Sequence, residues 1–291
     1  MNVNSFSELV EIAEKTNVSL DKVVLHWEML DTGEAPEKII EETSKLLAVM
    51  EEEYKLNEGK TFKTLVGLTG TNSKKMLDHL TNALIGKTAF TAAMIAVNMA
   101  ESNAAMGRIV ACPTGGSSGV MPGVLLTLEK IGVERQKLVS GLIVAGAIGK
   151  IISKRASLSG AESGCQAEIG SATAMAAGAA VHATGGTPKQ VANAAALSLK
   201  SFMGLVCDPV GGFVEVPCVK RNASGAVIAL LFSDMAKAGV ESVIPFDEVA
   251  EAMGKVGRMM PESLRETGKG GIADTPTAKM IVQRFSNKFK L

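Results

Sequence analysis

The pattern of apolar and polar positions divides the chain into regions of different character. In the first 57 residues, apolar positions recur at the spacing of amphipathic helices among dense charge. These positions are Leu9, Val10, Ile12, Ala13, Ile39, Ile40, Leu46, Leu47 and Met50. Ser5 and Glu8 have the spacing of a capping box, and Pro36 suits the first turn of a helix. We therefore predict two or three amphipathic helices within residues 1–60.

From about residue 64 to residue 235, Ala, Gly, Met and Val dominate, with scattered polar residues. Strand-like alternation is nearly absent, and segments of at least ten residues that end near Gly read as helices. They cover residues 88–105, 138–152, 165–184, 188–203 and 223–238. We predict an all-α fold with a helical domain over residues 61–291, preceded by the 1–60 helices or continuous with them.

The remaining segment, residues 239–291, regains charge and contains the sequence TGKGGIADTPT at 267–277. Its Gly, Pro and Thr residues predict a loop between a helix and a basic tail. Composition fits an all-α fold, since 46% of residues are hydrophobic but only 4% are aromatic, and Gly numbers 30. Such a chain of small residues suits closely packed helices.

Charge and hydropathy argue against nucleic acid and membrane partners. Thirty Lys and Arg balance thirty Asp and Glu, so the chain has no electrostatic footprint for a polyanion. The longest uncharged stretches, 109–128 and 169–188, are broken by Gly, Ser and Thr and read as buried core. The N-terminus is acidic from its first turn and lacks a secretory pattern, so we expect a cytoplasmic location with reduced thiols.

Three of the four cysteines, Cys165, Cys207 and Cys218, lie in unusual surroundings rich in Gly and Pro. Each can be a small buried hydrophobe. Zinc is a weaker idea, because no Cys-x2-Cys pair and no neighbouring His is present. An iron–sulfur cluster accepts wider spacing, and three cysteines suffice if one iron lacks a protein ligand. Spacing alone leaves the role of Cys112 open.

The segment PTGGSSGVMPG at 113–123 is the strongest candidate for binding a carboxylate or a phosphate. Its glycines let backbone N–H groups approach a ligand, and Thr and Ser add hydroxyls. It lacks the Lys of a P-loop and follows no predicted strand, so nucleotide binding is disfavoured. A structural turn without a ligand is the alternative. His26, His79 and His182 are isolated, which favours capping or core roles.

Two Gly-rich segments resemble each other: MGRIVACPTGG at 106–116 and MGLVCDPVGG at 203–212. Each follows a predicted helix and contains a Cys, a Pro and a Gly pair. The similarity arises either by chance or from a duplicated helix–loop unit. A duplicated unit predicts that the two loops lie around one centre.

Four motifs follow one another in the chain. They are NAAMGRIVACPTGGSSG at 103–119, ASLSGAESGCQAEIG at 156–170, CDPVGGFVEVPCVKRN at 207–222 and LRETGKGGIADTPT at 264–277. Together they resemble the iron–sulfur L-serine dehydratases, in particular the alpha chain of the two-chain form. The resemblance covers roughly residues 60–280. It departs at Lys154 and Arg155, where small polar residues are expected, and it is loose over 66–80.

The resemblance implies an all-helical catalytic domain whose Gly-rich loops converge on a [4Fe–4S] cluster held by Cys165, Cys207 and Cys218, with Cys112 not a ligand. It implies β-elimination of water from L-serine to give pyruvate and ammonia, in amino-acid degradation and gluconeogenesis. The open iron binds the substrate hydroxyl. A separate beta chain, carrying a Ser-Ser-His type motif, is the implied partner.

The residues of this chain suggest how substrate is held. The candidates for orienting the carboxylate are Asn103, Thr114, Gly115, Gly116, Ser117, Ser118 and Gly119. Candidates for the base that removes the Cα proton are Lys154, His182 and Glu162. One rival is a pyridoxal-phosphate lyase with Lys154 as its Schiff-base lysine and the 113–119 loop as its phosphate cradle. The other is a non-catalytic helical scaffold.

Overall fold

The computed structural model describes residues 3–289, and within that range it is built of helices without a β-strand. One isolated bridge pairs Cys207 with Arg265. The predicted all-α class is therefore confirmed.

The α-helices of this range are α1 (Phe6–Thr16), α2 (Leu20–Thr32), α3 (Pro36–Asn57), α4 (Asn72–His79), α5 (Lys87–Ala104), α6 (Val120–Lys130), α7 (Arg135–Arg155), α8 (Gly160–Ser163), α9 (Ser171–Ala183), α10 (Pro188–Ser201), α11 (Cys218–Lys237), α12 (Phe246–Met259) and α13 (Pro276–Phe289). Short 3-10 turns are η1 (Leu80–Asn82), η2 (Gly115–Ser117), η4 (Val210–Gly212), η5 (Glu262–Leu264) and η6 (Gly271–Asp274), and η3 (Gln166–Gly170) is a π-helical turn.

The five helices predicted for the apolar region appear as α5, α7, α9, α10 and α11. Two differences concern the candidate site. The segment predicted as one helix from residue 165 begins with the π-helical turn η3 before α9. The predicted Gly-rich loop is shorter than expected, because α6 starts at Val120. Pro122 does not prevent this, since it is the third residue of α6, where backbone N–H groups have no partner within the helix.

At the two ends of the chain, the sequence patterns correspond to helices. The predicted N-terminal helices are α1, α2 and α3, and the Ser5 hydroxyl accepts a hydrogen bond from the Glu8 N–H at 3.2 Å. Helix α3 begins at Pro36. The predicted basic tail forms α13, which starts at Pro276. Because α1, α2 and α3 each pack on helices of the later region, the division at residue 60 stays a prediction.

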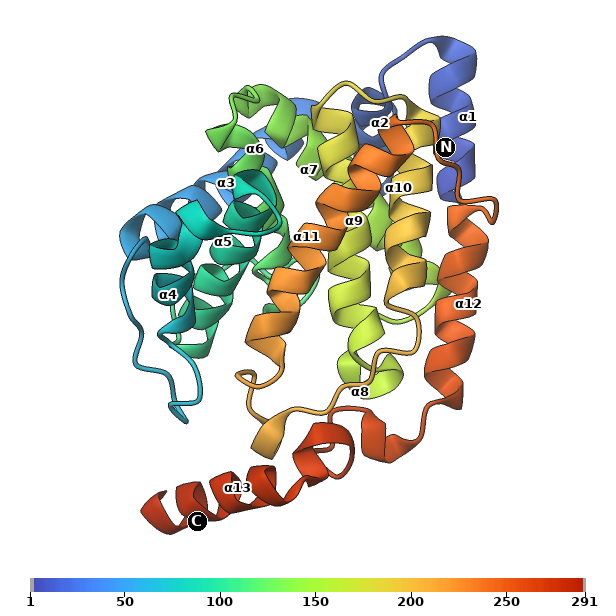
Figure 1. Ribbon diagram of the computed structural model, residues 1–291. Helices are drawn as coiled ribbons and strands as arrows, with labels where there is room; N and C mark the ends of the chain where they lie inside the picture. The colour runs from blue at the N-terminus through green and yellow to red at the C-terminus, as the bar shows by residue number, and fades with distance from the viewer. Residues whose placement is uncertain (1–2, 290–291) are drawn as a thin grey trace.

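Helix α9 forms the centre of the bundle, packed by α6, α7, α10 and α11 (Figure 1). All of its residues except His182 are buried. Small side chains allow this close approach: a Cβ added to Gly141 of α7 would lie 2.7 Å from the Ala179 carbonyl oxygen of α9. The scarcity of aromatic residues thus reflects helices packed backbone to backbone.

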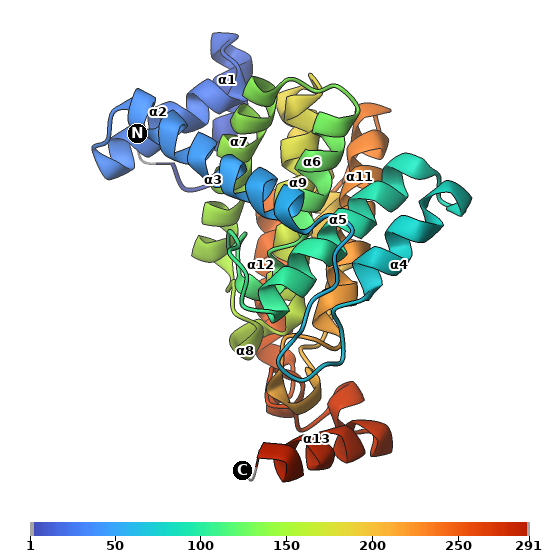
Figure 2. The ribbon, with the colours of Figure 1, turned by 90° about the vertical axis from the view of Figure 1, so that its left-hand side faces the viewer.

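Helix α7 is long and apolar enough to cross a membrane. In this molecule 61% of its most apolar window is buried against other helices, which is how the core helix of a bundle is packed. Figure 2 shows α3 lying across the bundle beside α7, with α4 and α5 on the opposite side of the view.

One end of the bundle gathers the loops that carry the sequence motifs. Helix α8, the chain between α10 and α11, and the segment after α12 all lie at this end (Figure 1). Helix α13 lies beyond them and packs on η4 and η6. The rings of Phe213 and Phe285 meet edge to face, with centroids 5.0 Å apart. The fold therefore brings segments that are distant in sequence to a single end.

Candidate functional site

Three cysteines lie on three separate segments at this end of the bundle. Cys165 precedes η3, Cys207 follows α10 in an extended segment, and Cys218 is the first residue of α11. Cys165 and Cys207 are each only 3% exposed. The backbone of Cys207 is held on both sides: its N–H donates to the Leu264 carbonyl at 2.9 Å, and its carbonyl accepts from the Glu266 N–H at 2.7 Å.

The three thiols are close enough to affect one another's ionisation. Burial raises the pKa of Cys165 to about 11 and that of Cys218 to about 12. Burial also raises the pKa of Cys207, and negative charge on Cys165 or Cys218 raises it further. As free thiols they are therefore neutral at pH 7, and ionising one disfavours ionising the next.

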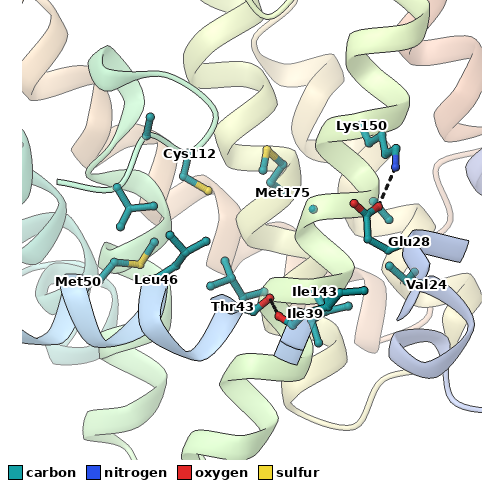
Figure 3. A pocket seen from close by; sticks show the side chains of 15 residues that line it. Val24, Glu28, Ile39, Thr43, Leu46, Met50, Cys112, Ile143, Lys150 and Met175 are labelled. Atoms are coloured by element: carbon teal, nitrogen blue, oxygen red, sulfur yellow. Dashed lines mark hydrogen bonds and ion pairs between the residues drawn. The ribbon is translucent and has the colours of Figure 1, made fainter. Parts of the chain in front are cut away.

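The fourth cysteine stands apart from this set. Cys112 is buried, and burial alone raises its pKa to about 12. Its thiol lines a cavity of about 320 Å³ between α2, α3 and α7, together with Met175 and Met50 (Figure 3). None of the other three cysteines lines this cavity.

The Gly-rich loop 113–119 is anchored at its own turn and to α5. The hydroxyls of Thr114 and Ser117 lie 3.1 Å apart, and the Thr114 N–H donates to the Ser117 hydroxyl at 3.3 Å. The Asn103 amide, at the end of α5, donates to the Gly115 carbonyl at 3.0 Å. Within the part of the chain that the structure describes, the Ser118 hydroxyl is buried without a hydrogen-bond partner.

Asn222 ties the same loop to the first turn of α11. Its side-chain amide donates to the carbonyls of Gly116 at 2.8 Å and Cys218 at 3.0 Å. Its side-chain oxygen accepts from the Gly119 N–H at 2.9 Å. The side chain is fully buried, so the loop and the Cys218 segment are fixed relative to each other.

Glu168 joins the loop to the cysteines. One carboxylate oxygen accepts from the Thr114 hydroxyl at 2.7 Å, and the other lies 3.9 Å from the Cys207 sulfur. A Cβ added to Gly160 would lie 2.6 Å from Glu168 Oε2 and 3.1 Å from Cys207 Sγ, so a larger residue would displace the Glu168 carboxylate. Burial raises the pKa of Glu168, and the hydrogen bond from Thr114 opposes that shift.

Glu168 is a residue that the sequence analysis did not single out. Its place three residues after Cys165, in a helical turn, is the signal that puts both side chains on one face. Because its carboxylate contacts Thr114 of one Gly-rich segment and Cys207 of the other, the two segments lie around one centre. A duplicated helix–loop unit predicts this placement.

Two of the three candidate bases contact helix α2, and the third, Glu162, lies three residues before Cys165. His182 lies at the other end of α9, about 25 Å along the helix from Cys165, and its Nε2 is 3.4 Å from Asp21 Oδ1. Lys154 is exposed, with its Nζ 5.0 Å from the centre of the Trp27 ring on α2. Glu162 is exposed on α8 and accepts from the Ser157 hydroxyl at 2.5 Å.

The other two histidines also lie away from the cysteines. His79 packs edge to face against Phe90, with ring centroids 5.9 Å apart, and His26 is exposed on α2. Their surroundings match surface or packing roles.

Buried thiols, a carboxylate and a Gly-rich loop thus meet at one end of an all-α bundle. The family model described as "Serine dehydratase alpha chain" matches residues 15–273. The chain belongs to the serine dehydratase alpha chain family, which confirms the resemblance of its four motifs.

Individual relatives agree with the family. A "Probable L-serine dehydratase, alpha chain" of Bacillus subtilis (strain 168) is 46% identical over 282 residues, covering 96% of this chain and 93% of that protein. The "L-serine dehydratase, alpha chain" of Peptoniphilus asaccharolyticus is 38% identical over 97% of this chain and 98% of its own length. The "L-serine dehydratase TdcG" of Escherichia coli (strain K12) is 42% identical over 183 residues, 62% of this chain and 40% of that protein.

The pair of Asp21 and His182 predicts acid-sensitive stability away from the cysteines. Burial disfavours the charge of Asp21, but hydrogen bonds with His182 and Ser19 outweigh it and lower its pKa from 3.8 to about 2. A depressed carboxyl pKa stabilises the fold above the unfolded-state value, and that contribution is lost as pH falls towards the folded-state value. Asp21→Asn is expected to lower the free energy of unfolding near neutral pH by about 1 kcal/mol, because solvent screens the interactions of this half-buried carboxyl.

Denaturant unfolding of both proteins across the acid range checks this expectation. The difference between wild type and Asp21→Asn should shrink as pH falls from about 4 towards 2. The control is Glu11→Gln, an exposed partner of Lys15, which should change little at any pH. A constant difference between wild type and Asp21→Asn would contradict the assignment.

Proposed function

We propose that this chain is the alpha subunit of an L-serine dehydratase, a lyase that converts L-serine to pyruvate and ammonia by eliminating water. The observation that carries the proposal is the Glu168 carboxylate between the Gly-rich loop and Cys207, in a member of the serine dehydratase alpha chain family. The names of the Bacillus and Peptoniphilus relatives support serine as the substrate and a separate beta chain as the partner.

We further propose that Cys165, Cys207 and Cys218 hold a [4Fe–4S] cluster. The donors fit: three sulfur side chains that share one end of the bundle and interact through their charges. Within residues 3–289 no three His, Cys, Asp or Glu side chains are spaced to hold one metal ion. A cluster calls for wider spacing, because each thiolate binds a different iron. Coordination to a cation also offsets the burial and repulsion that raise the thiol pKa values.

When bound, such a cluster with one iron free of protein ligands supplies a Lewis acid for the substrate hydroxyl. The residues of this chain supply orientation. In this proposal, Thr114, Ser117 and the backbone of the Gly-rich loop hold the substrate carboxylate, and Glu168 offers negative charge for the ammonium group. These contacts would orient the amino acid beside the cysteines.

The proton at Cα needs an acceptor. Lys154 and His182 contact Trp27 and Asp21 on α2, whereas Glu162, on the short helix before Cys165, stays a candidate. We propose that the separate beta chain completes the site and supplies this acceptor. The placement of Lys154 against Trp27 also weakens the pyridoxal-phosphate alternative, which requires that lysine to face the 113–119 loop.

Iron binding tests the assignment of the cysteines. Cys165→Ala, Cys207→Ala and Cys218→Ala should each remove most of the iron and acid-labile sulfide taken up in anaerobic reconstitution, because a ligand is lost. Cys112→Ala is the matched control, since it removes a buried thiol from a different cavity, and it should retain wild-type content. Full iron content in any of the first three variants would remove that residue from the ligand set.

The Gly-rich loop is tested by steady-state kinetics of the complex with its beta chain. Thr114→Val should raise KM for L-serine and lower kcat/KM by roughly ten- to hundredfold, since a hydrogen bond to a charged group is lost. Thr184→Val, which removes a hydroxyl that bonds the Ala180 carbonyl on α9, is the control. Iron content should be normal in both variants. Wild-type kinetics for Thr114→Val would show that the loop is structural.

A further inference from the structure

A guanidinium group stands among the three cysteines, and the proposed chemistry does not use it. Arg221 lies three residues after Cys218 in the first turn of α11, so the two side chains share a helix face. The Arg221 side chain is only 18% exposed. Burying such a group is costly unless its N–H donors are paired. The partners of these donors therefore show which segments the guanidinium connects.

The contacts of Arg221 reach both sides of Cys207. One terminal nitrogen donates to the Val206 carbonyl at 2.8 Å, and the other donates to Asp208 Oδ1 at 2.8 Å. The Arg221 charge also acts on Cys165, whose pKa it lowers against the larger effect of burial. One planar fork therefore joins the backbone on both sides of Cys207 to the helix turn that begins with Cys218.

Asp208 holds the guanidinium in place. It is 3% exposed, and its second oxygen accepts from the Ile272 N–H at 2.8 Å. Gly271, at a φ of +60°, lies directly against the Asp208 side chain, and any Cβ there would overlap the carboxylate. The Gly-rich segment after α12 thus packs against Asp208 and is the third segment in this arrangement.

An arginine suits this place for geometric and electrostatic reasons. Its guanidinium stays protonated, and it presents several donors in a rigid plane, whereas a lysine offers a single flexible point charge. Three thiolates beside Glu168 and Asp208 concentrate negative charge, which a buried cation offsets. Hydrogen bonds of this kind around metal ligands orient them, and removing such a partner costs about 10- to 100-fold in metal affinity or activity.

We propose that Arg221, locked by Asp208, is a positioning residue that fixes the Cys207 segment against the helix turn of Cys218 and so determines how firmly the thiols hold a cluster. The inference rests on the proposed function, because it concerns the cluster that those thiols would bind. The segment after α12, which contacts Asp208, then helps to keep the Arg221 guanidinium in place.

The test measures cluster retention. The full chain is reconstituted anaerobically with Fe(II) and sulfide, and the rate at which iron passes to a strong chelator is followed spectroscopically. Arg221→Gln is expected to release iron about 10- to 100-fold faster than wild type. Arg221→Lys should fall between the two, because it keeps the charge but loses the fork. Arg135→Gln, an exposed arginine on α7 that bonds Glu51, is the matched control and should behave as wild type.

Each outcome separates the inference from the proposed function. If wild type takes up no iron and sulfide, the proposed function fails and the inference falls with it. If wild type holds a cluster and Arg221→Gln releases iron at the wild-type rate, only the inference fails. Full retention in Arg221→Lys would show that charge alone matters and would overturn the positioning role. Circular dichroism checks folding, and Asp208→Asn, which should also speed release, replaces Arg221→Gln if that variant does not fold.

Discussion

The structure depends on a constraint at one end of the bundle, where three thiols, two carboxylates and a guanidinium are withdrawn from water together. Each group alone is costly to bury, so each is paired: Arg221 with Asp208, and Glu168 with Thr114. These pairs cross between segments far apart in sequence. The same hydrogen bonds that satisfy the polar groups therefore also set the geometry of the site.

The rest of the fold supplies a rigid base for this end. Helix α9 is buried on all sides through its small residues. The π-helical turn η3 leads into it and contains Glu168, and Cys165 directly precedes that turn. Asn222 extends the rigidity by joining the Gly-rich loop to α11. Helices α1 to α3 cover the side of α7, where Cys112 lies in its separate cavity.

The sequence predicted the helices better than it predicted which side chains contact one another. Long apolar segments such as α7 and α10 were found because their period is local. The cysteines and the Gly-rich loop were found from residue type and motif. Glu168 and Arg221 were not found, because their partners come from other segments of the chain. Thr114 is the partner of Glu168, and Val206 is a partner of Arg221. His182 was considered as a base from its chemistry alone, and only the fold shows that it faces Asp21.

The account rests on a site that this chain begins and a second chain completes. The direct test is to measure pyruvate and ammonia released from L-serine by the anaerobically reconstituted chain, alone and with its beta chain. The account predicts equal amounts of the two products, formed only when both the iron–sulfur reconstitution and the beta chain are present. High turnover by this chain alone, or turnover by iron-free protein supplied with pyridoxal phosphate, would contradict it.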